Sequence, residues 1–162
     1  YKGWLAHIGN ITHERVSVPF LSAIGSTHNE IPELFRGLLC VGDVCHEFKS
    51  LIKKLKLEKC IHLVGHLRQE EALKIAEGSD ALLVLEADME TSPFLPSKFA
   101  DYMLIGKPII AVTPQVSPIR DYLKTYSQGV CVSHNEKNIS TVLKNTWMEF
   151  IGKKMMKKHK LG

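Results

Sequence analysis

The sequence predicts a Rossmann-like α/β fold, with a parallel sheet of about six strands and helices on both faces, in three layers. Short apolar runs alternate with segments of helical periodicity along the whole of the 162 residues. Parallel strands need crossover connections, which are usually helices, so this alternation favours a parallel sheet. The run at 81–85 is apolar without interruption, as expected for a strand buried on both faces. No repeat or linker divides residues 1–162, which are predicted to be one domain.

The elements are predicted from periodicity and from the residues that begin and end them. Strands are expected at residues 4–9, 38–41, 60–64, 81–85, 109–112 and 129–132. Helices are expected at residues 17–24, 44–57, 69–77, 95–105, 118–124 and 139–151. Asp43 is a candidate cap for the second helix. Pro96 near the start of the fourth helix and Gly106 at its end follow the usual asymmetry of helix termini.

Charge is unevenly distributed along the chain. The net charge is +4, but residues 151–162 hold five lysines and no acid, which leaves 16 basic against 17 acidic residues elsewhere. A nucleic-acid surface would spread Lys and Arg across the fold, so no nucleic-acid partner is predicted. The basic tail is expected to be a solvated helix end or a peripheral contact with anionic lipid. No apolar run approaches the ~20 residues of a membrane-spanning helix, and a cytoplasmic location is expected.

Metal chemistry receives little support from the sequence. The four cysteines form no C-x-x-C pair, and three of them lie in apolar runs expected to be strands. Cys40, Cys45 and His46 lack the fourth ligand of a closed zinc site. Asp88 and Glu90 imitate a D-x-D metal site, but they are interpreted as a coincidence in a loop. No metal and no cofactor are therefore predicted.

The loops that follow the strands are the expected ligand site, because open α/β sheets bind ligands at the carboxyl ends of their strands. Neither G-x-G-x-x-G nor a P-loop motif is present. A helix N-terminus beyond the strand at 81–85 favours an anion such as a diphosphate, and Lys98 adds a positive charge there. Asp101, on the same helix face, could accept hydrogen bonds from a sugar diol. A solvated Lys98–Asp101 ion pair is the alternative, and spacing alone leaves both open.

Residues 96–102 and 106–111 resemble a known motif. They read P-S-K-F-A-D-Y and G-K-P-I-I-A, and they are similar to the P-S-K-x-x-E-Y … G-K-P-I variant of group 1 glycosyltransferases. Further similarities run in order from Trp4 to Leu143, including an opening G-N followed by Arg15 and an L-x-x-V-G ending at Gly42. The resemblance covers most of the chain, which makes it more specific than any one motif.

This resemblance implies the C-terminal, donor-binding half of a two-domain GT-B enzyme. The chain, which begins at Tyr1, is then a fragment that lacks the N-terminal acceptor domain and is expected to be inactive alone. The full-length enzyme would be a retaining glycosyltransferase of hexosyltransferase type, working in polysaccharide or glycan biosynthesis. It would take a nucleotide-diphosphate sugar as donor and a glycan or lipid-linked acceptor.

The resemblance also implies roles for individual residues. The donor diphosphate is expected to contact Gly9, Asn10, Arg15 and Lys98. The nucleoside is expected to contact Gly65, His66, Leu67 and Asp101, with an Asp at 101 where the family usually has Glu for the ribose. The family often has a second Glu, for the donor sugar, at the position of Pro93, so Glu90 is the candidate replacement. The resemblance assigns no catalytic residue within this chain.

Two alternative functions remain open at this point. One is a nucleotide-sugar epimerase with the same GT-B architecture, which would bind the same donor. The other is a non-catalytic flavodoxin-like module, such as a receiver or interaction domain. A receiver requires paired acidic residues at the end of its first strand, where this sequence has Gly9 and Asn10.

Overall fold

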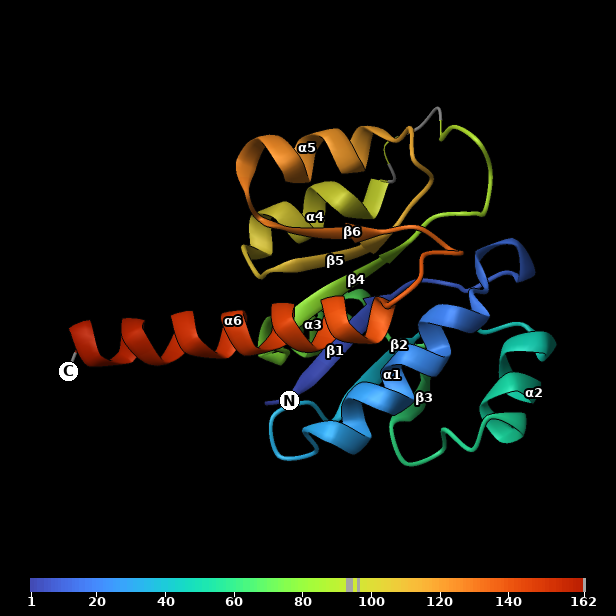
Figure 1. Ribbon diagram of the computed structural model, residues 1–162, viewed down its shortest axis with the longest axis horizontal. Helices are drawn as coiled ribbons and strands as arrows, with labels where there is room; N and C mark the ends of the chain where they lie inside the picture. The colour runs from blue at the N-terminus through green and yellow to red at the C-terminus, as the bar shows by residue number, and fades with distance from the viewer. Residues whose placement is uncertain (93–94, 96, 162) are drawn as a thin grey trace.

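The computed structural model describes residues 1–92, 95 and 97–161. Its six strands are all parallel and lie in the order β3-β2-β1-β4-β5-β6 (Figure 1). The strands are β1 (Trp4–Ile8), β2 (Gly37–Val41), β3 (Ile61–Gly65), β4 (Ala81–Leu85), β5 (Ile109–Val112) and β6 (Gly129–Val132). The helices are α1 (Val18–Glu30), α2 (His46–Lys54), α3 (Gln69–Gly78), α4 (Ser97–Ile105), α5 (Pro118–Tyr126) and α6 (Ile139–Leu161), with a 3₁₀ turn at His13–Arg15.

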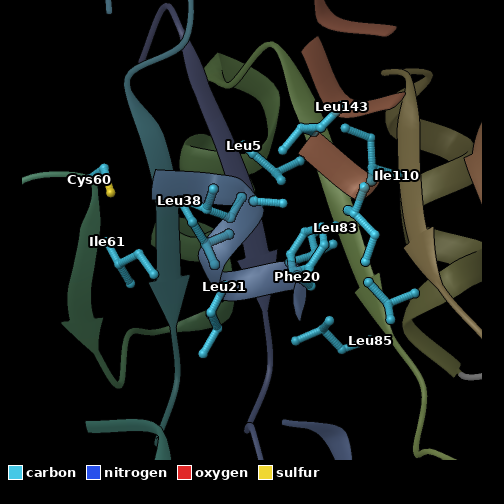
Figure 2. Close-up of a cluster of buried hydrophobic side chains, with 14 of the residues drawn as sticks. Leu5, Phe20, Leu21, Leu38, Cys60, Ile61, Leu83, Leu85, Ile110 and Leu143 are labelled. Atoms are coloured by element: carbon cyan, nitrogen blue, oxygen red, sulfur yellow. The ribbon is translucent and has the colours of Figure 1, made fainter. Parts of the chain in front are cut away.

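Helices cover both faces of the sheet, and the predicted three-layer fold is confirmed. On one face, α1, α2 and α6 pack around Phe20, Phe48 and Trp147. Figure 2 shows strand side chains meeting those of α1 and α6 in this layer. On the other face, α3, α4 and α5 pack on alternate strand residues around Phe99. Because β2, β4 and β5 are buried along their whole length, both layers are needed to cover them.

The strand order reverses between β1 and β4, which are neighbours in the centre of the sheet. Chain connections run outward from this point, toward β3 on one side and β6 on the other. The loops after β1 and β4 therefore diverge at the carboxyl edge and leave room between them, which is where ligands bind in such sheets.

Three helices differ from the sequence-based prediction by three or more residues at one end, and the others by at most two. Asp43 does not cap α2, because residues 43–45 bond to the loop after β1 through Ile11, and α2 starts only at His46. Helix α1 continues six residues beyond the predicted end at residue 24. Its last part contains Gly25, where a Cβ would lie 2.6 Å from Leu57 Cδ2, so tertiary packing outweighs the low helix propensity of this segment.

Helix α6 is also longer than predicted and runs past the end of the sheet toward the C-terminus (Figure 1). Its basic part is helical, and two of its lysines form ion pairs. Lys153 Nζ lies 2.9 Å from Glu149 Oε1, and Lys154 Nζ lies 2.6 Å from the buried carboxylate of Asp80. No helix in the described part of the chain is long and apolar enough to cross a membrane.

Candidate functional site

A cavity of about 470 Å³ opens at the carboxyl edge of the sheet, between the loops after β1, β2 and β3 and the helices α3 and α4. Six of the nine residues predicted for donor binding line it: Gly9, Asn10, His66, Leu67, Lys98 and Asp101. These residues come from three segments that are distant in the sequence, and the fold brings them together around one cavity.

The base of this cavity is held by hydrogen bonds between neighbouring loops. The Gly9 amide donates to the carbonyl of Val41 at 2.8 Å, and the Gly42 amide donates to the carbonyl of Gly65 at 2.8 Å. A Cβ at Gly42 would lie 2.6 Å from the Gly9 carbonyl oxygen, so only glycine permits this approach. Gly65 thus supports the cavity from behind and is not one of its lining residues.

Asn10 takes part in the same loop contacts. Its side-chain oxygen accepts a hydrogen bond from the Asp43 amide at 3.0 Å, and its carbonyl accepts one from Arg15 Nη1 at 3.3 Å. The side-chain oxygen of Asn10 therefore serves the adjoining loop, while its main chain remains beside the cavity.

Tyr102 fixes α4 against the sheet, and sequence reasoning did not identify it as a site residue. Its hydroxyl accepts a hydrogen bond from the Ile8 amide at 2.9 Å and donates one to the Leu83 carbonyl at 3.2 Å. Burial raises the pKa of this hydroxyl, which keeps it protonated. Because it bonds to the last residue of β1 and to the middle of β4, Tyr102 sets the position of Lys98 and Asp101 on the same helix. Its place in the P-S-K-x-x-E-Y motif was the available signal.

Lys98 and Asp101 are both exposed on the cavity side of α4. Neither forms an ion pair with the other among the residues that the structure describes, so the predicted alternative of a surface pair is not formed. Arg68 also lines the cavity, just beyond the predicted loop residues 65–67, and sequence reasoning missed it. The cavity thus offers two basic side chains and one carboxylate to a ligand.

Arg15 lies outside the cavity wall, but it contributes to the positive charge at the end of β1. The pKa of the buried His7 is lowered to about 4, chiefly by burial and further by repulsion from Arg15 and Lys98. Both cations therefore act on the same strand end. His7 Nδ1 has no hydrogen-bond partner within the described part of the chain, which fits a neutral ring.

The pKa of His7 predicts a pH-dependent stability. Its value is 6.5 in an unfolded chain and about 4 in the fold, so acidification protonates the unfolded chain first. The stabilising contribution is complete above pH 6.5 and is lost as the pH falls toward 4. Because each pKa unit corresponds to 1.36 kcal/mol, the loss is about 3 kcal/mol. Urea unfolding of His7→Phe should show a correspondingly smaller loss between pH 7 and 4 than the parent chain. The exposed His62→Phe is the control, and equal slopes in all three proteins would contradict the assignment.

Glu90, the candidate contact for the donor sugar, is exposed in the loop after β4 and does not line the cavity. This loop is attached to its surroundings by a hydrogen bond of 3.1 Å from the Asp88 amide to the Glu14 carbonyl and by a bridge between Thr91 and Val116. Pro93 and Pro96, which also figured in the sequence comparison, lie outside the described residues. The structure therefore does not unite Glu90 with the other predicted site residues.

Within the described residues, no three His, Cys, Asp or Glu side chains are grouped as a metal site would require. All four cysteines are free. Cys60 lies just before β3 and not within it, which corrects the predicted start of this strand. Burial raises the pKa of Cys40 to about 12, so this thiol remains protonated at neutral pH.

The sequence matches no family model and no curated protein. Solved structures, in contrast, match over nearly the whole chain. WaaG, a glycosyltransferase involved in lipopolysaccharide biosynthesis, is 18% identical, with a TM-score of 0.68 over 91% of this chain and 38% of WaaG. The C-terminal domain of a group 1 family glycosyltransferase from Francisella tularensis, LpcC, is 16% identical, with a TM-score of 0.61 over 92% of this chain and 75% of that one. The chain has the fold of a group 1 glycosyltransferase C-terminal domain.

A third similar structure was solved with ligands. HepE of Anabaena, in complex with UDP and glucose, is 17% identical, with a TM-score of 0.65 over 93% of this chain and 39% of HepE. The chain thus spans about two fifths of the length of WaaG and of HepE. The fold agrees with the resemblance found in the sequence motifs.

Proposed function

We propose that this chain is the donor-binding half of a retaining glycosyltransferase that uses a nucleotide-diphosphate sugar in polysaccharide or glycan biosynthesis. The observation that carries the proposal is the cavity at the carboxyl edge, where a loop base closed by glycines meets Lys98 and Asp101 of α4. The glycine loop permits close approach of a diphosphate, and the cation of Lys98 would balance its charge. The carboxylate of Asp101 would accept hydrogen bonds from a ribose. We further propose that the whole enzyme has a second domain and that its donor carries a hexose.

The proposed chemistry uses the charges of the protein and requires no metal ion. Transfer of the sugar leaves a nucleoside diphosphate on which negative charge develops. Lys98 in the first turn of α4, the amide groups of that turn and the nearby Arg15 would stabilise this charge. Asp101, one turn later, would accept hydrogen bonds from the ribose hydroxyls. The nucleobase of the donor would lie against the loop of His66 and Leu67.

The comparisons support a donor of this class. HepE was solved with UDP and glucose, and it shares the fold of this chain. Since this chain corresponds to about two fifths of HepE, we propose that the acceptor, a glycan or a lipid-linked sugar, binds to a second domain. The isolated chain is then expected to bind donor without transferring sugar.

A titration with UDP, GDP and ADP tests the proposal. A donor-binding domain alone would supply only half of the proposed cleft, so weak binding is expected, with a Kd of roughly micromolar to millimolar. Amide resonances of Gly9, Gly65 and Lys98 should shift with at least one nucleotide. Lys98→Gln should weaken the binding, whereas Lys124→Gln on the exposed side of α5 should not. If none of the three nucleotides shifts these resonances, the proposed function is wrong.

The distal part of α6 is proposed to touch anionic lipid at the cytoplasmic face of a membrane. Lys157, Lys158 and Lys160 form no ion pair within the described residues, and Met155 and Met156 beside them are 57% and 62% exposed. Each basic residue close to such a surface contributes about 1 kcal/mol, so three would give a reversible attachment.

Liposome sedimentation tests this attachment. Replacing Lys157, Lys158 and Lys160 by Gln should reduce partitioning into vesicles that contain anionic phospholipid by about a hundredfold, with a smaller difference at high salt. A matched variant loses the exposed Lys49, Lys53 and Lys54 of α2 and should sediment like the parent chain. Equal losses in both variants would assign the effect to net charge and exclude a role of α6.

A further inference from the structure

A buried carboxylate lies at the end of β4, outside the cavity described above. Glu86 is only 6% exposed, and it forms no ion pair with a basic side chain among the described residues. Its carboxylate instead accepts two short hydrogen bonds. Ser92 Oγ donates to Oε1 at 2.6 Å, and Ser117 Oγ donates to Oε2 at 2.6 Å. A buried carboxylate is costly without such partners, so these contacts compensate for its loss of water.

The hydrogen bonds of Glu86 join several elements at the carboxyl edge. Ser92 belongs to the loop between β4 and α4, and Ser117 is the N-cap of α5. The main-chain carbonyl of Glu86 is 2.7 Å from His134 Nε2, and the His134 carbonyl accepts a bond from Ser17 Oγ, the N-cap of α1. One residue thus ties the loop after β4 to the starts of α5 and α1.

The buried residue Ser92 attaches the loop after β4 to Glu86. Ser92 is buried, whereas Asp88, Met89 and Glu90 before it are exposed. The Ser92 amide also donates to the Val116 carbonyl at 2.9 Å, so both the main chain and the side chain of Ser92 are held. Five residues later the chain enters α4, whose second residue is Lys98.

We propose that Glu86 is a positioning residue for donor binding. By holding Ser92, five residues before the first residue of α4, it anchors the loop of residues 87–92 that precedes this helix. The start of α4, which carries Lys98, is then in place before a ligand arrives, and no ordering cost is incurred on binding. The effect on donor binding rests on the proposed function, whereas the effect on the loop does not.

Two measurements on the same set of variants test the proposal. Ser92→Ala removes the loop contact and should speed hydrogen exchange of the amides at 87–92 at least tenfold in the free protein. It should also weaken binding of UDP-glucose about tenfold. Ser92→Thr keeps the hydroxyl and should restore both values. Ser117→Ala removes the other contact of the same carboxylate, and it should lower the Tm but leave loop exchange and affinity within about twofold. Glu86→Leu should reproduce the loop effect of Ser92→Ala, which remains informative if Glu86→Leu does not fold.

The possible outcomes separate the two levels of the proposal. Unchanged loop exchange in Ser92→Ala would overturn the attachment itself. Faster exchange with unchanged UDP-glucose affinity would overturn the positioning role while leaving the proposed function intact. Failure of the parent chain to bind UDP, GDP, ADP or UDP-glucose would overturn the proposed function, together with the positioning role that depends on it.

Discussion

Replacing Asp101 by asparagine is expected to weaken the binding of a nucleoside diphosphate by about tenfold or more. The change keeps the shape of the side chain and removes the charged acceptor, and a hydrogen bond to a charged group contributes about 1.5–3 kcal/mol. Asp101 is exposed and lines the cavity, and no hydrogen bond joins it to another described side chain. The Tm should therefore change by less than about 2 °C. Calorimetric titration and thermal unfolding measure the two effects.

Two further variants show whether the effect belongs to the site. Asp101→Glu restores the residue that is usual in the family motif and should bind within about threefold of the parent chain. Asp121→Asn removes an exposed carboxylate from α5, away from the cavity, and should have no effect on affinity. If Asp101→Asn binds as tightly as the parent chain, Asp101 is not the ribose acceptor.

Substituting alanine for Gly42 should damage both the fold and the cavity. The residue has a φ of +125°, and a Cβ would lie 2.6 Å from the Gly9 carbonyl oxygen and 3.1 Å from Asn10 Oδ1. These neighbours are the hydrogen-bonded loop base, so they cannot move aside independently. Strain and overlap together should lower the free energy of unfolding by about 3 kcal/mol or more. Urea unfolding measures the loss, and nucleotide affinity should fall with it.

Alanine substitutions at Gly65 and Gly152 are controls that separate steric overlap from conformational strain as the cause of this loss. At Gly65 the φ is +85°, but a Cβ added there would have no atom within 4 Å, so alanine should cost only the conformational strain, about 1–2 kcal/mol. Gly152 lies within α6 with free space around it, and alanine there should stabilise the helix slightly. A loss at Gly42 no larger than that at Gly65 would show that the close approach of the loops is unimportant.

Much of the fold could be predicted because strand ends and helix periodicity are local properties. The uninterrupted apolar run at 81–85 and the glycines at or just after the ends of β1, β2 and β3 indicated the sheet and its ligand-binding edge. The start of α2 was missed because residues 43–45 pair with Ile11, a contact between loops that spacing does not reveal. The end of α6 was missed because its apolar pattern fades where its lysines begin.

The site was predicted in part for a related reason. Motif residues on one short segment, such as Lys98 and Asp101, could be predicted to share a face because a single helix turn relates them, and both line the cavity. Glu86 could not be recognised, since its partners Ser92 and Ser117 come close to it only when β4, β5 and the loops that follow them are assembled. Glu90 was assigned by its nearness in sequence to Pro93, and in the structure it is exposed and is not among the residues that line the cavity.

The loops at the base of the cavity and the loop after β4 are held by different sets of bonds, and this difference affects which residues can change as such a domain diverges. Next to β1, β2 and β3, main-chain groups bond to main-chain groups, so most side chains there can change if the glycines remain. Beyond β4, the loop is held by main-chain bonds to Glu14 and Val116 and, in addition, by the Ser92 hydroxyl on the carboxylate of Glu86. We expect lineages to exchange residues 87–91 freely while Glu86 and Ser92 change together. New sugar preferences could then arise without rebuilding the part of the protein that holds the nucleoside.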